Sequence, residues 1–383
     1  MKVKNTISYT IEIWLRIFGI WPNVSCVLLR RLFWFVALLI EQVFQYRYIV
    51  KQFHSIDFSE IMNILSATIA YLILLIKLVI FWCKQRTFNR ILTMMAIDWE
   101  KCSTTEFSMF VTTYNAKLSH RFANTIVIFY STAVVLFSSK IFLRLDDGTA
   151  SNVSTQVLIL DMELPFDTNQ RFVYELVLIV QFLHLILCSD VIGLLNALLI
   201  NLVLHISGQI DILCKGLITI FAEKRSLNHF TVKKIIKKHQ KIIIFSKQIE
   251  DLYSYIAIVL FVLNTLIICC LGFVIVASIG RPGASKSIIR TLLFYLAMNM
   301  EPFAFCFAGE YLSAKSNTIG DAAYDSLWYE SNPKDSRIIL FMIMRSQNQL
   351  TITIGKVMNL SLERFSSVVK ASASYISVLL AMY

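Results

Sequence analysis

The chain has 383 residues, of which 57% are hydrophobic and only 16% are charged. Soluble domains average about 45–50% apolar and about 25% charged residues, so this composition excludes an ordinary soluble protein. The net charge of +11 is better explained by cytoplasmic loops rich in Lys and Arg than by binding to nucleic acid.

Seven apolar segments are long enough to cross a bilayer, which takes about 20 residues of helix. The sequence therefore predicts an all-α, polytopic membrane protein with seven transmembrane helices and no separate soluble domain. In chain order the spans are Leu32–Val50, Ile61–Cys83, Phe122–Leu143, Phe172–His205, one within Tyr253–Ile279, one within Ile288–Gly309 and one within Thr351–Tyr383.

The distribution of Lys and Arg predicts the orientation of these spans. With a cytoplasmic N-terminus, the inner segments hold far more Lys and Arg than the outer ones, as the positive-inside rule requires. No removable signal peptide is expected, so the first span would act as the signal anchor. An odd number of spans then places the C-terminus outside the cell. Asn152, in an Asn-Val-Ser sequon between spans three and four, is a candidate extracellular glycosylation site.

Two predicted helices are longer than the membrane requires. Phe172–His205 would be about 51 Å long as a helix, against a hydrocarbon core of about 30 Å, so its inner end should project into the cytoplasm. Thr231–Ile279 is expected to be one helix that enters the membrane from the cytoplasm. Its first part mixes Lys with Ile at helical spacing, which suits either a collar where subunits pack or a helix on anionic lipid.

Polar residues inside the spans are functional candidates by default. Lys77 and Lys140 lie near span ends and are expected to extend their amines to the membrane surface. The last span carries a polar stripe, which predicts a pore-lining helix, a seam packed against other helices, or a soluble amphipathic helix. The stripe consists of Glu363, Ser367, Lys370, Ser374 and Ser377.

No catalytic or metal-binding motif is present, so neither an enzyme nor a cofactor is expected. The eight cysteines have no metal-site spacing. A G-protein-coupled receptor is disfavoured by the cytoplasmic N-terminus and by the absence of that class's motifs. A transporter would show paired broken helices in two halves, and none is visible.

The outer halves of spans two, three, four and six are expected to enclose a pocket. Its apolar and aromatic lining, with a few hydroxyls, would suit a small and mostly apolar ligand. Ordinary helix packing explains the same pattern at any single position. The candidate lining residues are Ile64, Thr68, Tyr71, Tyr130, Val134, Phe137, Ser138, Tyr174, Val177, Gln181, Leu292, Tyr295 and Met298.

A set of motifs near the C-terminus resembles one family. In order they are Cys306–Glu310, Ala322–Glu330, Arg345–Gln347, Ser361–Phe365 and Ser374-Tyr375. Together they resemble the insect odorant receptors. Asn348-Gln349 departs from the Lys-Pro of many members, and the related gustatory receptors remain the alternative.

The resemblance implies an odorant-gated, non-selective cation channel in the plasma membrane of olfactory sensory neurons. It implies a tetramer with a shared co-receptor, and a small volatile ligand in the outer pocket. The short loop before span five resembles that of a ligand-specific tuning subunit. On this basis residues 1–205 hold spans one to four and the pocket, 206–350 hold spans five and six with a cytoplasmic anchor, and 351–383 hold the pore helix.

The resemblance also assigns the last helix to the pore wall. Val378 and Met382 are one turn apart near its outer end, and we expect them to form a hydrophobic constriction that closes the pore by dewetting. Glu363, Lys370 and Ser374 would lie below, in a wider and wetted part. Of these, Lys370 fits a cation pathway least well.

Overall fold

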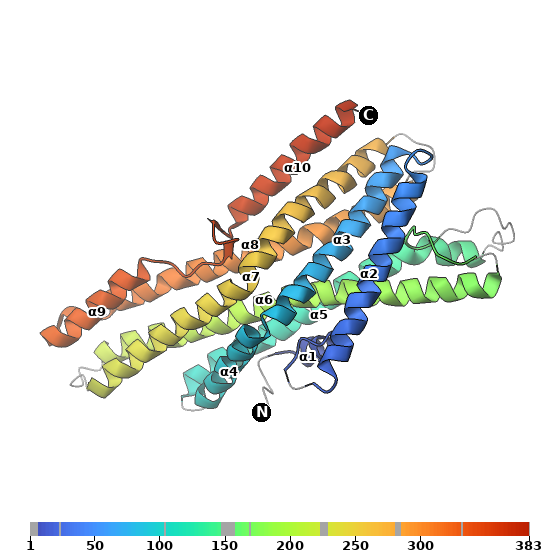
Figure 1. Cartoon of the computed structure of the whole chain (residues 1–383). Coiled ribbons are helices and arrows are strands. Elements are labelled where there is room, and N and C mark those ends of the chain that lie inside the picture. The colour runs from blue at the N-terminus through green and yellow to red at the C-terminus, as the bar shows by residue number, and fades with distance from the viewer. Residues whose placement is uncertain are drawn as a thin grey trace.

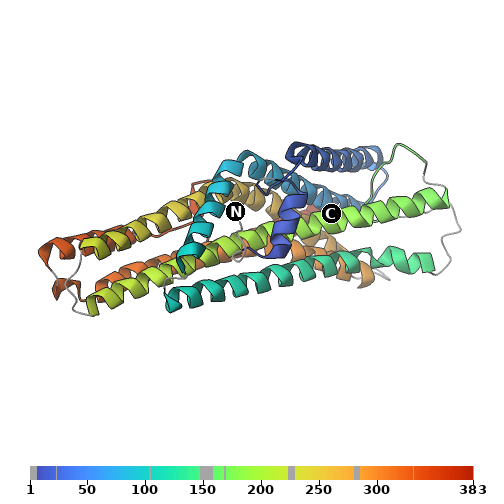
Figure 2. The ribbon, with the colours of Figure 1, turned by 90° about the horizontal axis from the view of Figure 1, so that it is seen from below.

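The structure is a computed structural model that describes residues 7–22, 24–102, 105–146, 158–167, 170–222, 229–279, 285–330 and 332–382. This part of the chain is almost entirely helical, and the long helices run roughly along one axis (Figures 1 and 2). The all-α, polytopic fold is thereby confirmed. Its elements are α1 (Tyr9–Ile17), α2 (Val27–Gln52), α3 (Phe58–Cys83), α4 (Gln85–Cys102), α5 (Glu106–Asp146), α6 (Arg171–Ala222), α7 (His229–Ala277), α8 (Ser285–Asp325), the 3-10 helix η2 (Trp328–Glu330), α9 (Pro333–Ser346), β1 (Thr353–Ile354), β2 (Met358–Asn359) and α10 (Leu362–Met382).

Helices α2, α3, α5, α6, α7, α8 and α10 occupy the seven predicted spans. Within the described residues, five helical segments are long and apolar enough to cross a bilayer, and they belong to α3, α5, α6, α7 and α8. Glu41 and Arg47 lower the hydropathy of α2, and the polar stripe lowers that of α10. Membrane crossing by these two helices therefore stays a prediction.

The long helices extend well beyond the apolar segments. Helix α6 has 52 residues, or about 78 Å at 1.5 Å per residue, and α7 is one continuous helix of 49 residues. Both lengths agree with the predicted extension past the bilayer. The C-terminal part of α6, the N-terminal part of α7 and the C-terminal part of α8 run side by side with α9 at one end of the molecule (Figures 1 and 2).

A short hairpin separates the bundle from α10. Gly355 and Lys356 have φ angles of 58° and 63°, which allow the tight turn between β1 and β2. The Gly355 N–H donates to the carbonyl of Ser254 on α7, at 3.0 Å. Helix α10 then begins at Leu362, where the Ser361 hydroxyl caps the N–H of Arg364 at 3.3 Å. The last predicted span thus starts with a hairpin, and its helix has 21 residues.

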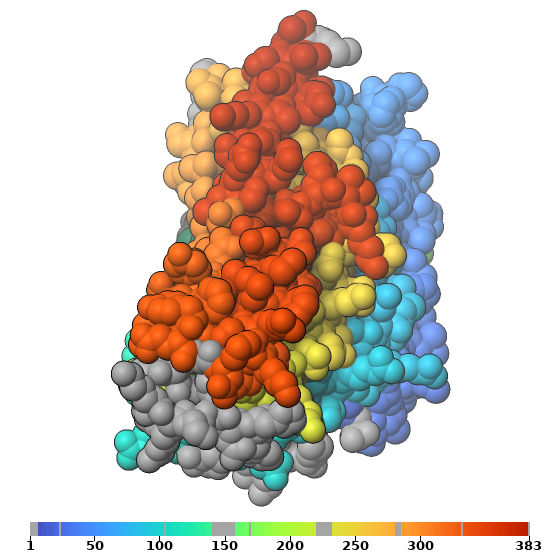
Figure 3. Space-filling model, turned by 90° about the vertical axis from the view of Figure 1, so that its left-hand side faces the viewer, coloured from blue at the N-terminus to red at the C-terminus, as the bar shows by residue number. Residues whose placement is uncertain are grey.

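Helix α10 lies along the surface of the bundle, beside α7 and α8 (Figure 3). A narrow stripe faces α7: Ser372 is buried, and its carbonyl accepts a bond from Cys269 Sγ at 3.8 Å. Gly272 of α7 makes room for Ile376, because a Cβ on Gly272 would lie 2.2 Å from Ile376 Cδ1. Most of the remaining α10 surface is exposed in the single chain.

Candidate ligand-binding cavity

A cavity of about 720 Å³, counting its open side, lies between α3, α5, α6 and α8. Spaces between the helices of a bundle are common binding sites for small molecules. Its walls are almost entirely apolar. The space exists because alanines, among them Ala67, Ala70, Ala133 and Ala297, stand where larger side chains would fill the gap between helices.

The cavity brings together several of the residues expected at a pocket. Tyr71 of α3, Tyr130, Val134 and Phe137 of α5, and Met298 of α8 all line it. The three α5 residues are spaced by four and three positions, so one face of that helix forms a wall.

Other expected residues lie near the cavity without lining it. Ile64 lines a smaller space next to it. Thr68 is buried within α3, where its hydroxyl donates to the Ile64 carbonyl at 2.9 Å. Ser138 is buried, and its hydroxyl has no hydrogen-bond partner among the residues that the structure describes.

The expected residues on α6 and α8 are placed differently. Tyr174 and Tyr295 are partly buried and pack against the core, and Val177 is half-buried. Leu292 is 41% exposed, so it lies on the outer surface of the bundle. The cavity wall on α8 is formed instead by Phe294 with Ala297 and Met298.

Gln181 closes the outer side of the cavity rather than lining it. Its Oε1 accepts from the Ile159 N–H at 3.1 Å, and its Nε2 donates to the Leu160 carbonyl at 3.2 Å. Leu160 lines the cavity, so this one amide holds a loop segment over it. Glu163 of the same segment bonds Lys51 of α2 at 2.5 Å.

Sequence reasoning missed the loop residue Leu160 and the deeper α6 residues that line the cavity. On α6 these are Leu185, Cys188, Ser189 and Ile192. They lie one or more turns below Gln181, because the cavity is deeper than the outermost turns of α6. The sequence did hold one signal for the cavity. Alanines on helices that also carry aromatic residues leave space between those helices.

The polar groups of the cavity are few. Tyr130 donates its hydroxyl to the Ala297 carbonyl at 3.2 Å, so that group is already used. The Tyr71 hydroxyl is buried without a hydrogen-bond partner in the described part of the chain. Its ring stacks on His184 at 5.7 Å, which fixes its position. The cavity thus offers a ligand mostly apolar surface, with the hydroxyls of Tyr71 and Ser189 among its lining groups.

Beneath the cavity lies a buried charged pair. Lys77 of α3 forms an ion pair with Glu301 of α8, and their side chains are 2% and 1% exposed. Asn196 Oδ1 lies 3.4 Å from Lys77 Nζ. Lys77 therefore does not extend to the membrane surface as expected, because a carboxylate from a distant part of the sequence is available inside. The side chain of Lys140 lies outside the described set, as does residue Asn152.

The predicted pore residues are exposed on α10. Glu363, Ser367, Lys370 and Ser374 are exposed, and Val378 is 57% exposed. They point away from the stripe that contacts α7. Met382 ends α10, and its side chain is outside the described set.

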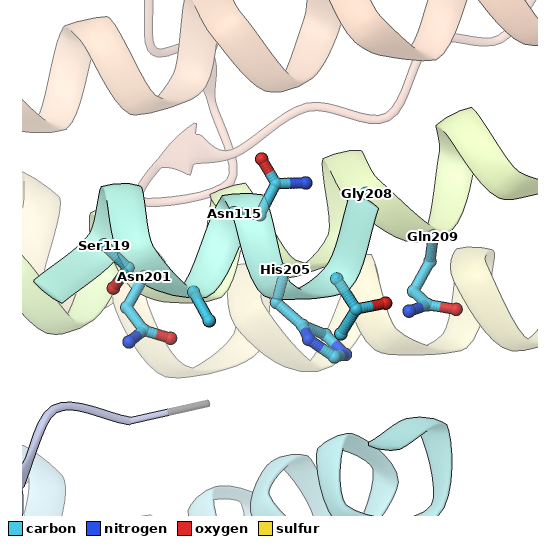
Figure 4. A pocket seen from close by; sticks show the side chains of 8 residues that line it. Asn115, Ser119, Asn201, His205, Gly208 and Gln209 are labelled. Carbon is cyan, nitrogen blue, oxygen red and sulfur yellow. The ribbon is translucent and has the colours of Figure 1, made fainter. Parts of the chain in front are cut away.

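A second, polar cavity lies between α5 and α6 in their inner halves (Figure 4). Ser119 and Asn201 lie side by side, whereas Asn115 turns the other way, toward Gly208 (Figure 4). A Cβ on Gly208 would lie 2.5 Å from Asn115 Nδ2, so a larger residue there would require the Asn115 side chain to shift. These side chains do not converge on one point, and we assign them to helix packing.

An ion-pair cluster borders this cavity. Asp98 of α4 accepts from Lys241 of α7 at 2.6 Å, and His205 Nε2 lies 3.4 Å from its other oxygen. Burial alone would raise the pKa of Asp98, but its bonds to His205 and Lys241 outweigh burial and hold the pKa below its ordinary value. The described residues contain no group of three or more candidate metal ligands.

Both the sequence and the fold are similar to those of known proteins. A family model described as 7tm odorant receptor matches residues 57–373. Odorant receptor 10 of Aedes albopictus is 31% identical over 152 residues, 40% of each chain. Odorant receptor 13a of Drosophila melanogaster is 27% identical over 192 residues, 46% of each chain. These matches span less than half the length of the relatives.

The structure of the olfactory receptor OR5 from Machilis hrabei in complex with eugenol is similar to this chain. The TM-score is 0.83 at 16% identity, and the match covers 98% of this chain and 97% of that chain. The same receptor without eugenol gives a TM-score of 0.78 at 17% identity. At these identities the likeness is one of fold.

Proposed function

This chain belongs to the 7tm odorant receptor family, and from that premise we propose that it is the odorant-binding subunit of a ligand-gated, non-selective cation channel. Membership makes it a multi-pass membrane receptor and not an enzyme. The observation that carries the proposal is the apolar cavity between α3, α5, α6 and α8, with Tyr71, Tyr130 and Phe137 in its wall. The family match favours the odorant branch over the gustatory alternative.

The ligand is a small, mostly apolar volatile. Each CH₂ group that leaves water for such a cavity contributes about 0.8 kcal/mol, so a short hydrocarbon body supplies most of the binding free energy. The free hydroxyl of Tyr71 supplies one hydrogen bond. Val134 and Met298 complete the walls on α5 and α8.

The pore is formed by α10 from each subunit of a tetramer that includes the shared co-receptor. The polar stripe from Glu363 to Ser374 supports this assignment, because its side chains are exposed in the single chain. Val378 and Met382 form the constriction at the outer end of α10. Lys370 would stand in the wetted part, where Glu363 or a neighbouring subunit would have to offset its charge.

Odorant opens the pore only by binding the open state more tightly than the closed one. The structure offers a physical connection for this shift. Met298 in the cavity wall is bonded to Asn264 of α7, and α7 carries α10 through Gly272 and Ile376. A ligand that moves α8 therefore acts on the helix that supports the pore wall.

Whole-cell recording tests the proposal. We expect odorant-evoked cation current in cells that express this chain with the co-receptor, and none from this chain alone. The control is a co-receptor-only cell. Current that depends on an added G-protein pathway would contradict the proposal, and so would odorant-evoked flux without any channel conductance.

Substitution at the constriction tests the pore. Val378→Ala or Met382→Ala should raise basal current or alter ion permeation, because each shortens an apolar side chain at the narrowest point. Val357→Ala is the matched control, since Val357 is 79% exposed on the hairpin. Currents left unchanged by both constriction variants would overturn the assignment.

The proposed orientation places Asn152 outside the cell and the N-terminus in the cytoplasm. A second sequon, Asn359-Leu360-Ser361, lies on the side proposed to be cytoplasmic and serves as the comparison. We expect glycosidase treatment to shift the mobility of the wild-type chain and of Asn359→Gln, but not of Asn152→Gln. A shift that persists in Asn152→Gln and disappears in Asn359→Gln would reverse this topology.

A further inference from the structure

A smaller and more polar chamber adjoins the main cavity on its outer side. It holds about 360 Å³, counting its open side. It shares Ala67, Phe137, Leu160 and Phe294 with the main cavity, so the two spaces are adjacent. We call it the outer chamber. Its remaining lining residues are Gln45, Asn63, Ile64, Ile159, Asp161 and Arg290.

Arg290 of α8 is the distinctive residue of the outer chamber. Its guanidinium carbon lies 4.8 Å from the centre of the Phe137 ring, and Phe137 meets Phe294 edge-on at 6.1 Å. Arg290 therefore stands on the aromatic partition between the two spaces. A cation over an aromatic face is attracted to it, which holds the guanidinium at this boundary.

The hydrogen-bonding capacity of Arg290 is unused. The side chain is half-buried, and within the described residues it makes no hydrogen bond or ion pair. A guanidinium carries five N–H donors and no acceptor. Donors that are partly withdrawn from water gain when an acceptor reaches them. The boundary of the two spaces thus offers a ligand several donors.

The charges around Arg290 favour one kind of hydrogen-bond acceptor in a ligand. The carboxylates of Asp161 and Glu60 lie within electrostatic range of Arg290, and Asp161 lines the same chamber. They already offset much of the positive charge, so a ligand carboxylate would meet like charges as well as the guanidinium. A neutral carbonyl oxygen accepts the same hydrogen bonds without that repulsion.

We propose that Arg290 and the outer chamber form a polar subsite for the carbonyl group of a neutral ligand whose hydrocarbon chain fills the main cavity. The chemical class is a ketone or ester with an unbranched apolar chain. This inference rests on the proposed function, because it assumes that the main cavity holds the ligand. It goes further by assigning one residue and one functional group to selectivity.

Ligand-induced stabilisation of the purified full-length complex with its co-receptor measures the effect. The probes are a homologous series of 2-alkanones, the n-alkanes of equal length and the alkanoates of equal length. Titrated unfolding midpoints give the dissociation constants. We expect the best 2-alkanone to bind about tenfold or more tightly than its alkane, and the alkanoate to bind more weakly than the ketone.

Arg290→Met removes the donors and keeps much of the side-chain length. It should abolish the preference for the ketone and leave alkane affinity unchanged. Arg290→Lys keeps a cation over Phe137 and should retain part of the preference for the ketone. It is the variant to measure if Arg290→Met does not fold. Arg47→Met is the matched control, since Arg47 is exposed on α2 and lies outside the chamber.

Several results would overturn the subsite. They are equal binding of ketone and alkane by the wild type, tightest binding of the alkanoate, or an equal loss of ketone and alkane affinity in Arg290→Met. The last would mean that Arg290 only supports the fold. If no probe binds at all while other odorants do, the subsite is also wrong. If no odorant binds in the main cavity, the proposed function fails instead.

Discussion

Asn264 of α7 donates a hydrogen bond from Nδ2 to the main-chain carbonyl of Met298 on α8, at 3.0 Å. The carbonyl needs this donor because the residue four positions on is Pro302, which has no N–H to offer. Met298 lines the cavity proposed to bind the ligand. The bond therefore joins the cavity wall to the helix on which α10 rests.

Replacing Asn264 should reveal the value of this bond. Asn264→Leu keeps the volume but leaves the Met298 carbonyl buried without a donor, at a cost of about 1–3 kcal/mol. Pro302→Ala restores an N–H to the same carbonyl, so the double variant should be more stable than Asn264→Leu alone. Unfolding midpoints and odorant dose–response curves provide the measurement. If the double variant were no more stable than Asn264→Leu, the unpaired Met298 carbonyl would not be the cause of the destabilisation.

The buried pair of Lys77 and Glu301 should tolerate joint replacement better than single replacement. Lys77→Met leaves an uncompensated buried carboxylate and should cost about 3–5 kcal/mol, whereas Lys77→Met with Glu301→Leu should recover most of that loss. Surface expression and unfolding midpoints test this. The control is Arg171→Met, in an exposed pair worth about 0–1 kcal/mol. Equal damage from the single and double variants would contradict the expectation.

Gly272 should control how closely α10 packs on α7. Gly272→Ala brings a methyl group against Ile376, and such overpacking costs about 1–3 kcal/mol. We expect altered basal current and partial rescue by Ile376→Val, measured in cells with the co-receptor. Gly216→Ala is the matched control, because nothing lies within 4 Å of its added methyl group. Identical currents from the two glycine variants would refute this role.

Acid should weaken the inner cluster around Asp98. Its pKa is held below the ordinary value, so the unfolded chain takes up the proton more readily than the folded one. The stabilisation is therefore present above the unfolded pKa of about 3.9 and is lost as pH falls through the folded pKa. Unfolding midpoints from pH 7 to about pH 3 should fall less for Asp98→Asn than for wild type. The exposed Asp325 provides the control substitution, and parallel curves for wild type and Asp98→Asn would argue against the effect.

The helices were largely predictable because apolar runs of bilayer length have few alternative structures. The short helices α1 and α9 were not expected, since nine and 14 residues carry too little periodic signal. On α5, Tyr130, Val134 and Phe137 recur at spacings of four and three residues, so they were placed on one wall. On α8, Leu292, Leu293 and Phe294 follow one another, so periodicity there does not separate the cavity side from the outer side of the bundle.

Contacts between distant parts of the sequence were beyond sequence reasoning. Lys77 was expected at the membrane surface because its partner Glu301 is far along the chain, and no spacing rule connects them. Leu160 was missed for the same reason, since a loop reaches the cavity only through the folded position of Gln181. The unused donors of Arg290 likewise appear only once its neighbours are known.

The loop over the cavity also affects how fast a bound ligand can leave. Gln181 bonds both Ile159 and Leu160 with the two ends of one amide, so neither bond opens without disturbing the other. Because Leu160 covers the cavity, a bound molecule escapes on that side only when both bonds part together. How long a response outlasts its stimulus would then depend on the dissociation rate set by this amide, separately from the affinity set by the cavity walls.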